Sequence, residues 1–305
     1  MKIVQPPFLK PGDCIGITCP AGFLDRDKST ACITTLQQWG YEVMVGATTK
    51  SKSKNYFSGT DQERLDELQA MLDDPSIRAI VFGRGGYGTS RIIDKLSFKK
   101  FLKHPKWLAG FSDITVIHNH ILTNFGIASI HSSMAAEFQK EADLNRNIQS
   151  LKNLLEGNHP KYKTANHPLN QYGKAEGYLV GGNLALLAHI IGSKSDFDTS
   201  RKILFIEDVG EYLYNIDRMM NQLKRAGKFN KPAAVIFGEF TDFKDTTRPY
   251  GKPIEEILKS YTVQLNCPVV FNFPVGHGAC NLALRHGGRY KLHATANKVL
   301  LEEVI

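Results

Sequence analysis

Short apolar runs alternate with stretches of helical spacing through the first half of the chain. We predict strands at residues 14–19, 41–45, 78–82, 107–109 and 127–130 from these runs. The intervening residues 28–39, 61–72 and 114–122 carry apolar side chains at three- and four-residue intervals, which is typical of helices. Because alternating strands and helices pack as a parallel sheet, this half predicts a doubly wound α/β domain.

The second half continues the alternation after a change of character. Residues 157–173 are rich in glycine, asparagine, histidine and proline, which indicates a linker or crossing segment. Further strands are predicted at 175–180, 202–206, 233–237, 268–271, 289–293 and 299–303, with helices at 184–191 and 214–223. We therefore predict an N-terminal domain at residues 1–160, a linker at 161–178, and a smaller C-terminal α/β domain at 179–305.

Composition narrows the classes of function. The 305 residues are 42% hydrophobic and 22% charged, as in a globular protein of two domains. The net charge of +8 favours an anionic partner, but the basic residues are scattered along the chain and form no nucleic-acid motif, so we expect no nucleic-acid partner.

Five cysteines without a C-x-x-C pair indicate reduced thiols. With no signal-peptide pattern and no long apolar stretch, we expect a cytoplasmic protein without membrane contact.

Two loops that follow predicted strands could contain binding or catalytic residues. Gly83-Arg-Gly-Gly-Tyr-Gly88 would let a backbone approach an anionic ligand, yet it is neither a P-loop nor the dinucleotide fingerprint. We interpret it as a small oxyanion-binding loop, with nucleotide binding as the alternative. Ser112 follows the strand at 107–109 and precedes a helix, as a nucleophilic serine on a strand-to-helix elbow does. The full G-x-S-x-G pattern is absent because Ile114 replaces its last glycine, and an ordinary helix N-cap is the other reading of Ser112.

Three polar residues, each placed just after an apolar strand, suggest nucleophilic catalysis. They are Ser112, Glu207 and His277. A histidine can accept the serine proton, and a carboxylate can hold the imidazole in the required tautomer. Spacing alone leaves other assignments open. The base could instead be His118, His120 or His131, and the acid could be Asp208 or Glu211. Glu207 could instead form an ion pair with Arg218.

The combination of motifs resembles the LD-carboxypeptidase family of serine peptidases, peptidase family S66. That family includes murein-recycling muramoyltetrapeptide carboxypeptidases and microcin C self-immunity peptidases. The motifs, in chain order, are Arg84-Gly-Gly-Tyr-Gly88, Gly110-Phe-Ser-Asp113, Phe205-Ile-Glu-Asp-Val-Gly-Glu211 with Tyr214-x-x-Asp217-Arg218, and Pro274-Val-Gly-His-Gly278. The chain departs from the family at Cys19, where a serine is common.

The resemblance implies a two-domain α/β fold with the active site between the domains, commonly in a homodimer, with no metal and no cofactor. It implies that Ser112 is the nucleophile, Glu207 the orienting acid and His277 the general base. The expected reaction is hydrolysis of the L,D peptide bond to a C-terminal D-alanine in a murein tetrapeptide. Cleavage of a microcin-type peptidyl-nucleotide and a non-enzymatic nucleotide-binding module are the alternatives.

This mechanism needs groups that hold the oxyanion and the substrate. We expect the backbone N–H groups of Gly86 and Asp113 to form the oxyanion hole. Arg84 and Tyr87 are the expected substrate-binding residues, with Arg84 as a carboxylate clamp or, alternatively, as a member of a structural ion pair.

Overall fold

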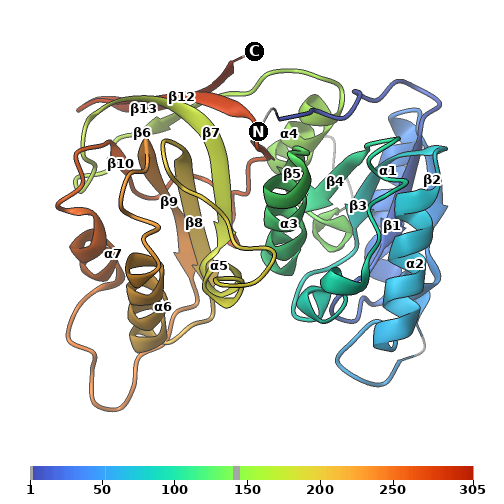
Figure 1. Ribbon diagram of the computed structural model, residues 1–305, viewed down its shortest axis with the longest axis horizontal. Helices are drawn as coiled ribbons and strands as arrows, with labels where there is room; N and C mark the ends of the chain where they lie inside the picture. The colour runs from blue at the N-terminus through green and yellow to red at the C-terminus, as the bar shows by residue number, and fades with distance from the viewer. Residues whose placement is uncertain (1–2, 52, 140–144, 305) are drawn as a thin grey trace. The chain divides into compact units, whose positions relative to one another are not determined.

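The computed structural model describes residues 3–51, 53–139 and 145–304, and the chain divides into two compact units. Unit 1 comprises Met1–Asn158 and Leu282–Arg285, and unit 2 comprises His159–Asn281 and His286–Ile305. Figure 1 shows the chain by residue number, from blue at the N-terminus to red at the C-terminus. A short late segment therefore returns to the unit that the first half of the chain builds.

Unit 1 is built on a six-stranded sheet in the order β11-β5-β4-β3-β1-β2. The neighbours from β2 to β5 pair in parallel. Its strands are β1 (Cys14–Thr18), β2 (Glu42–Val45), β3 (Ile77–Phe82), β4 (Trp107–Gly110), β5 (Ser129–His131) and β11 (Leu284–His286). Parallel pairing brings the carboxyl ends of β1, β3 and β4 to one edge, where an open α/β sheet places its ligand site.

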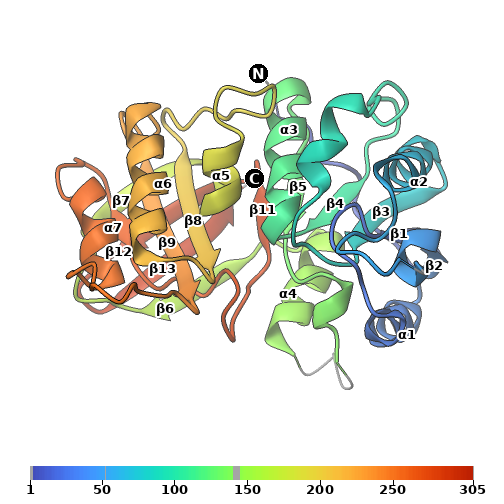
Figure 2. The same ribbon diagram turned by 90° about the horizontal axis from the view of Figure 1, so that it is seen from below.

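Helices cover both faces of this sheet (Figure 2). They are α1 (Thr30–Gln38) and α4 (Arg146–Leu155) on one face, and α2 (Asp61–Asp73) and α3 (Thr115–Phe125) on the other. Leu36 and Leu151 pack with Ile15 and Trp107 in the core beneath α1 and α4. The prediction of a doubly wound parallel domain is confirmed.

Unit 2 contains a seven-stranded mixed sheet in the order β10-β9-β8-β7-β12-β13-β6. The pairs from β10 to β7 are parallel, and those from β7 to β6 are antiparallel. Its strands are β6 (Lys161–Ala165), β7 (Gly173–Asn183), β8 (Ile203–Val209), β9 (Ala234–Thr241), β10 (Val269–Val270), β12 (Arg289–Ala294) and β13 (Lys298–Val304). The long strand β7 joins the two parts, because its first half pairs with β12 and its second half with β8.

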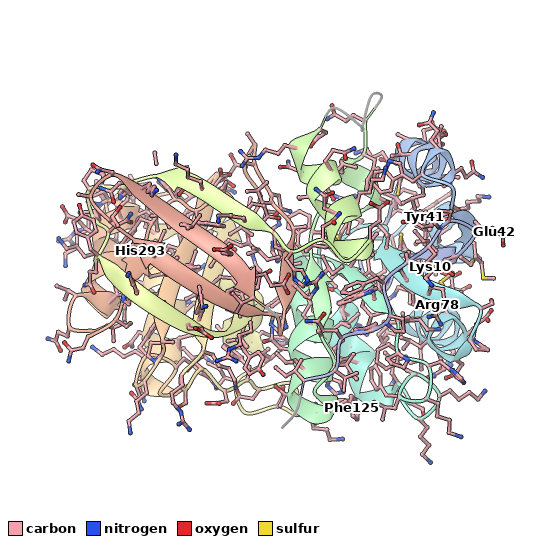
Figure 3. The ribbon with its side chains drawn as sticks, turned by 90° about the horizontal axis from the view of Figure 1, so that it is seen from above. Lys10, Tyr41, Glu42, Arg78, Phe125 and His293 are labelled. Atoms are coloured by element: carbon pink, nitrogen blue, oxygen red, sulfur yellow. The ribbon has the colours of Figure 1, made fainter. Side chains whose placement is uncertain are left out.

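Three helices accompany the parallel part of this sheet in Figure 1: α5 (Leu184–His189), α6 (Leu213–Arg225) and α7 (Ile254–Thr262). The antiparallel part follows a period of two, since Tyr290 and Leu292 are buried while Lys291 is exposed. Figure 3 looks onto this part of the unit and labels His293 on β12. The predicted second α/β domain is therefore confirmed as a mixed-sheet unit.

Among the α-helices and strands of the described residues, four lie outside the predicted set, namely α4, α7, β6 and β11. The segment 161–178, which we interpreted as a linker, contains β6 and the first residues of β7. Strand β11 spans three residues, which is too short for a periodic pattern to reveal. Over the residues that the structure describes, no helix is both long and apolar enough to cross a bilayer.

Candidate active site

Ser112 lies at a sharp turn between a strand and a helix. Strand β4 ends at Gly110, a short 3-10 helix begins at Ser112, and α3 follows from Thr115. The backbone of Ser112 has φ of 59°, a left-handed conformation that costs about 1–3 kcal/mol for a residue other than glycine. The side chain is partly exposed and is not the N-cap of either helix, so the ordinary N-cap reading is wrong. The serine instead occupies a strained elbow of the kind that presents a nucleophile.

The glycine-rich loop after β3 packs directly on this elbow. A Cβ atom added to Gly85 would lie 2.8 Å from Ser112 Cβ and 2.9 Å from Ser112 Oγ. The same Cβ would lie 3.3 Å from the Asp113 backbone nitrogen. Only glycine therefore allows the loop backbone to reach the serine. The Gly22 N–H donates to the Gly85 carbonyl at 3.0 Å, which holds the loop from the other side.

Two buried side chains fix the end of the loop. Asp113 accepts a hydrogen bond from the Thr89 N–H at 2.8 Å. Arg64 of α2 is fully buried, donates to the carbonyls of Pro20 and Gly88, and pairs with Asp61. One guanidinium thus ties together the loops that follow β1 and β3. Sequence reasoning missed Arg64, although its place four residues before the buried Leu68 puts it on the inner face of the helix.

A pocket of about 230 Å³ opens beside the glycine loop. Arg84 lines this pocket and donates to the Phe23 carbonyl at 2.7 Å, which is a contact with a neutral group. Tyr87 is 43% exposed, and its ring packs 5.9 Å from the ring of Phe57 rather than lining the pocket. Of the two expected substrate-binding residues, only Arg84 lines this pocket.

Glu207 and His277 form a close pair in unit 2. Glu207 Oε2 lies 2.7 Å from His277 Nδ1, with the Glu207 side chain 0% exposed and that of His277 17% exposed. Because an ionised carboxylate can only accept, the pair places the ring proton on Nδ1 and makes Nε2 the basic nitrogen. This is the arrangement that a general base oriented by a carboxylate requires.

The local backbone explains how the pair is held. The register of β8 against β9 shifts between Ile206 and Asp208, and such a bulge re-aims the side chain at its centre. Gly276 has φ of +129°, and a Cβ there would lie 3.0 Å from Glu207 Cβ and 3.1 Å from Glu207 Oε2. The Gly276 N–H donates to Asn281 Oδ1 at 3.1 Å. The histidine loop can therefore approach Glu207 only with glycine before His277.

The alternative acids have other partners. Asp208 accepts from Asn183 Nδ2 at 2.9 Å and from the Ala185 N–H at 3.1 Å, at the start of α5. Burial, followed by the neighbouring Glu207 charge, raises the pKa of Asp208 to about 7. Glu211 accepts from Asn215, and Arg218 also donates to Asn215. Glu207 itself lies inside β8 and not in the turn after it, because the strand continues to Val209.

The other candidate histidines are buried in unit 1. His118 Nε2 lies 2.8 Å from the Gly110 carbonyl oxygen, and burial lowers the pKa of this histidine to about 4. His120 packs against Phe98, and His131 packs edge-on against Phe111. These rings pack around the segment that holds the elbow.

The expected residues thus divide between the units. Unit 1 holds Ser112, Asp113, Gly86 and Arg84, whereas unit 2 brings Glu207 and His277 together. Within the three described ranges, no cluster of histidine, cysteine, aspartate or glutamate side chains could hold a metal ion.

Comparisons with known proteins bear on both units. The family model described as the LD-carboxypeptidase N-terminal domain matches residues 15–132, and that of the LD-carboxypeptidase C-terminal domain matches residues 176–292. A probable murein peptide carboxypeptidase of Bacillus subtilis is 33% identical over 301 residues, covering 98% of this chain and 94% of the relative. A crystal structure of muramoyltetrapeptide carboxypeptidase from Oxalobacter formigenes superposes with a TM-score of 0.86 at 30% identity, covering 96% and 99% of the two chains.

A second solved structure shows the same fold. MccF in complex with glutamyl sulfamoyl guanosine has a TM-score of 0.86 at 22% identity, with 98% of each chain covered. At this identity the likeness concerns the fold alone.

Proposed function

Because the chain belongs to the LD-carboxypeptidase family, a family of serine-type hydrolases, we propose that it cleaves the L,D peptide bond to a C-terminal D-alanine in murein tetrapeptides. The names of its relatives support this substrate, since they are a murein peptide carboxypeptidase and a muramoyltetrapeptide carboxypeptidase. The net charge of +8 suits a peptide that ends in a carboxylate. Family membership also favours an enzyme over the non-enzymatic nucleotide-binding module.

The proposed mechanism uses Ser112, Glu207 and His277 as a catalytic triad. The observation that carries it is the 2.7 Å contact between Glu207 Oε2 and His277 Nδ1, which leaves Nε2 as the base. Ser112 attacks the scissile carbonyl as His277 takes its proton, and the imidazolium then protonates the leaving D-alanine. Water cleaves the acyl-enzyme by the reverse transfer.

Two backbone N–H groups, those of Gly86 and Asp113, are the proposed oxyanion hole. The close approach of Gly85 to Ser112 and to the Asp113 nitrogen supports this choice, because Gly86 is the next residue along the loop. Each donor of this kind contributes about 3 kcal/mol to transition-state stabilisation. Arg84 and Tyr87 remain the proposed substrate-binding residues.

The decisive experiment measures D-alanine released from a murein tetrapeptide. We expect release by the wild type, a loss of activity of at least about 10³-fold in Ser112→Ala, and unchanged activity in Ser97→Ala, a control at an exposed serine of unit 1. Wild-type rates of release by Ser112→Ala would show that another residue is the nucleophile. Absence of release by the wild type would refute the proposed substrate.

The same assay addresses the microcin-type alternative. A peptidyl-nucleotide replaces the tetrapeptide, and the two values of kcat/KM are compared. We expect the tetrapeptide to be the better substrate, and the opposite ranking would favour the alternative.

We further propose that the protein is cytoplasmic and forms a homodimer. All five cysteines, each within the described ranges, are free thiols, which fits a reducing compartment. Cell fractionation would test the location, and light scattering on the purified protein would give its mass in solution.

A further inference from the structure

The pocket beside the glycine loop has the chemistry of a small anion site. Arg84 is the one charged side chain among the described residues that line it, and Arg84 is exposed. Asn55 and Tyr56 add an amide and a phenolic hydroxyl, both of which can donate. The described residues that line the pocket are Gly22, Phe23, Asn55, Tyr56, Arg84 and Gly86.

A hydrogen bond to the backbone holds the guanidinium of Arg84 at the pocket. Its Nη1 donates to the Phe23 carbonyl at 2.7 Å, and Phe23 itself lines the pocket. This contact with a neutral oxygen occupies one donor and leaves the positive charge uncompensated by any carboxylate of the lining residues. A planar guanidinium held in this way suits a carboxylate, which it can bind through two parallel hydrogen bonds.

The pocket also adjoins the part of the glycine loop that packs on the nucleophile. A Cβ added to Gly85 would meet Ser112, and the next residue, Gly86, lines the pocket, where an added Cβ would lie 2.8 Å from the Tyr56 hydroxyl. In a peptide that loses its last residue, the terminal carboxylate lies about one residue length, ~3.8 Å, beyond the scissile carbonyl. Because Gly85 packs on Ser112 and Gly86 lines the pocket, the pocket adjoins the nucleophile through one residue of the loop.

We propose that this pocket binds the free α-carboxylate of the C-terminal residue, with Arg84 as its cation and Asn55 and Tyr56 as additional donors. The proposal rests on the proposed carboxypeptidase function and names the group that makes the enzyme act at a chain end. A volume of about 230 Å³ suits one small residue and its carboxylate.

The test compares a tetrapeptide ending in D-alanine with the same peptide ending in D-alanine amide. We expect the wild type to prefer the free acid. In Arg84→Gln, kcat/KM for the acid should fall about 10- to 100-fold, as for the loss of a charge-assisted hydrogen-bonded pair, while kcat/KM for the amide changes by less than about threefold. Arg84→Lys should recover part of the preference, because it keeps the charge without the planar fork.

Arg78→Gln is the matched control. It removes the same charge from the same unit, but Arg78 lies at the start of β3, at the end of the strand away from the glycine loop, and does not line the pocket. We expect its preference for the acid to match that of the wild type. A similar loss of preference in both variants would overturn the proposal in favour of long-range electrostatics.

Binding to the Ser112→Ala variant gives a readout independent of turnover. Calorimetry should show tighter binding of the acid than of the amide, and adding Arg84→Gln should abolish the difference. If the wild type cleaves the acid but Arg84→Gln keeps the preference, or loses both activities equally, the carboxylate assignment is wrong while the proposed function stands. If the wild type cleaves neither peptide, the proposed function and this inference both fail.

Discussion

Replacing Glu207 by glutamine removes one negative charge from the pair with His277 and conserves the shape of the side chain. The carboxylate is fully buried, and its Oε2 lies 2.7 Å from His277 Nδ1. Glu207 Oε1 has no hydrogen-bond partner among the residues that the structure describes. A glutamine can therefore turn either its oxygen or its nitrogen toward the ring, and both orientations weaken the dyad.

The magnitude follows from this geometry. When His277 takes a proton, its charge lies 2.7 Å from the carboxylate, an attraction of about 6 kcal/mol at an effective dielectric constant of 20, taken as an upper bound. In serine peptidases, loss of the orienting carboxylate lowers kcat by about 10⁴-fold, mainly through the wrong histidine tautomer. We therefore expect kcat of Glu207→Gln to fall by about 10³- to 10⁴-fold.

The assay is D-alanine release from the tetrapeptide between pH 6 and 9, fitted for kcat and KM separately. We expect KM to change by less than about threefold, because Glu207 acts on the imidazole and not on bound substrate. Inactivation by a serine-directed phosphonate should slow in parallel with kcat. Glu211→Gln is the matched control, since its carboxylate contacts Asn215 four residues further along and should leave kcat unchanged.

Urea unfolding separates a catalytic defect from a folding defect. An unsatisfied buried amide costs about 1–3 kcal/mol, so the variant should remain folded under assay conditions. A folded Glu207→Gln that keeps more than about a tenth of the wild-type kcat would refute the orienting role. A variant with wild-type kcat and a raised KM would also refute the orienting role.

Three further predictions concern other parts of the site. Gly85→Ala would place a Cβ 2.8 Å from Ser112 Cβ, so the loop must move and kcat should fall about 100-fold; steady-state kinetics near the wild-type value would contradict this. Arg64→Met leaves the buried carbonyls of Pro20 and Gly88 without their donor, while Asp61 keeps its pair with Arg91. At about 1–3 kcal/mol for each carbonyl, the free energy of unfolding in urea should fall by about 2–5 kcal/mol, with Arg64→Lys less affected. Burial raises the pKa of Asp208 to about 7, so the folded protein keeps a proton that the unfolded chain loses near pH 4. The protonated carboxyl therefore contributes stability at low pH, and this contribution is lost as the pH rises to 7. Wild-type stability relative to Asp208→Asn should therefore decline from pH 4 to 7 and then level off, and parallel pH profiles in urea unfolding would count against it.

Local patterns sufficed to predict much of the fold. The capping box of Thr60 and Glu63 marks the start of α2, and the structure contains both of its reciprocal hydrogen bonds. The strand-to-helix position of Ser112 could be predicted because it depends on the periodicity of the residues on either side. Such features need only contacts between neighbours in the chain.

Other features depend on contacts between distant segments. Spacing named Glu207 but left Asp208 and Glu211 open as the acid, and the resemblance implied Glu207. The pairing of β8 with β9 and the return of the Gly276 loop explain how Glu207 meets His277. The spacing of Arg64 from Leu68 places it on the inner face of α2, but its hydrogen bonds to the loops after β1 and β3 arise only in the folded chain.

Patterns along the chain were enough to predict the alternation of strands and helices, the glycine loop, the serine elbow and the family resemblance. Folding revealed that Arg84 lines a pocket, that Glu207 contacts His277, and that β11 joins the first sheet. The physical reason is range, since periodicity and turn chemistry act within a few residues. Burial and hydrogen bonding between side chains 70 residues apart, as for His277 and Glu207, arise only when the chain has closed on itself.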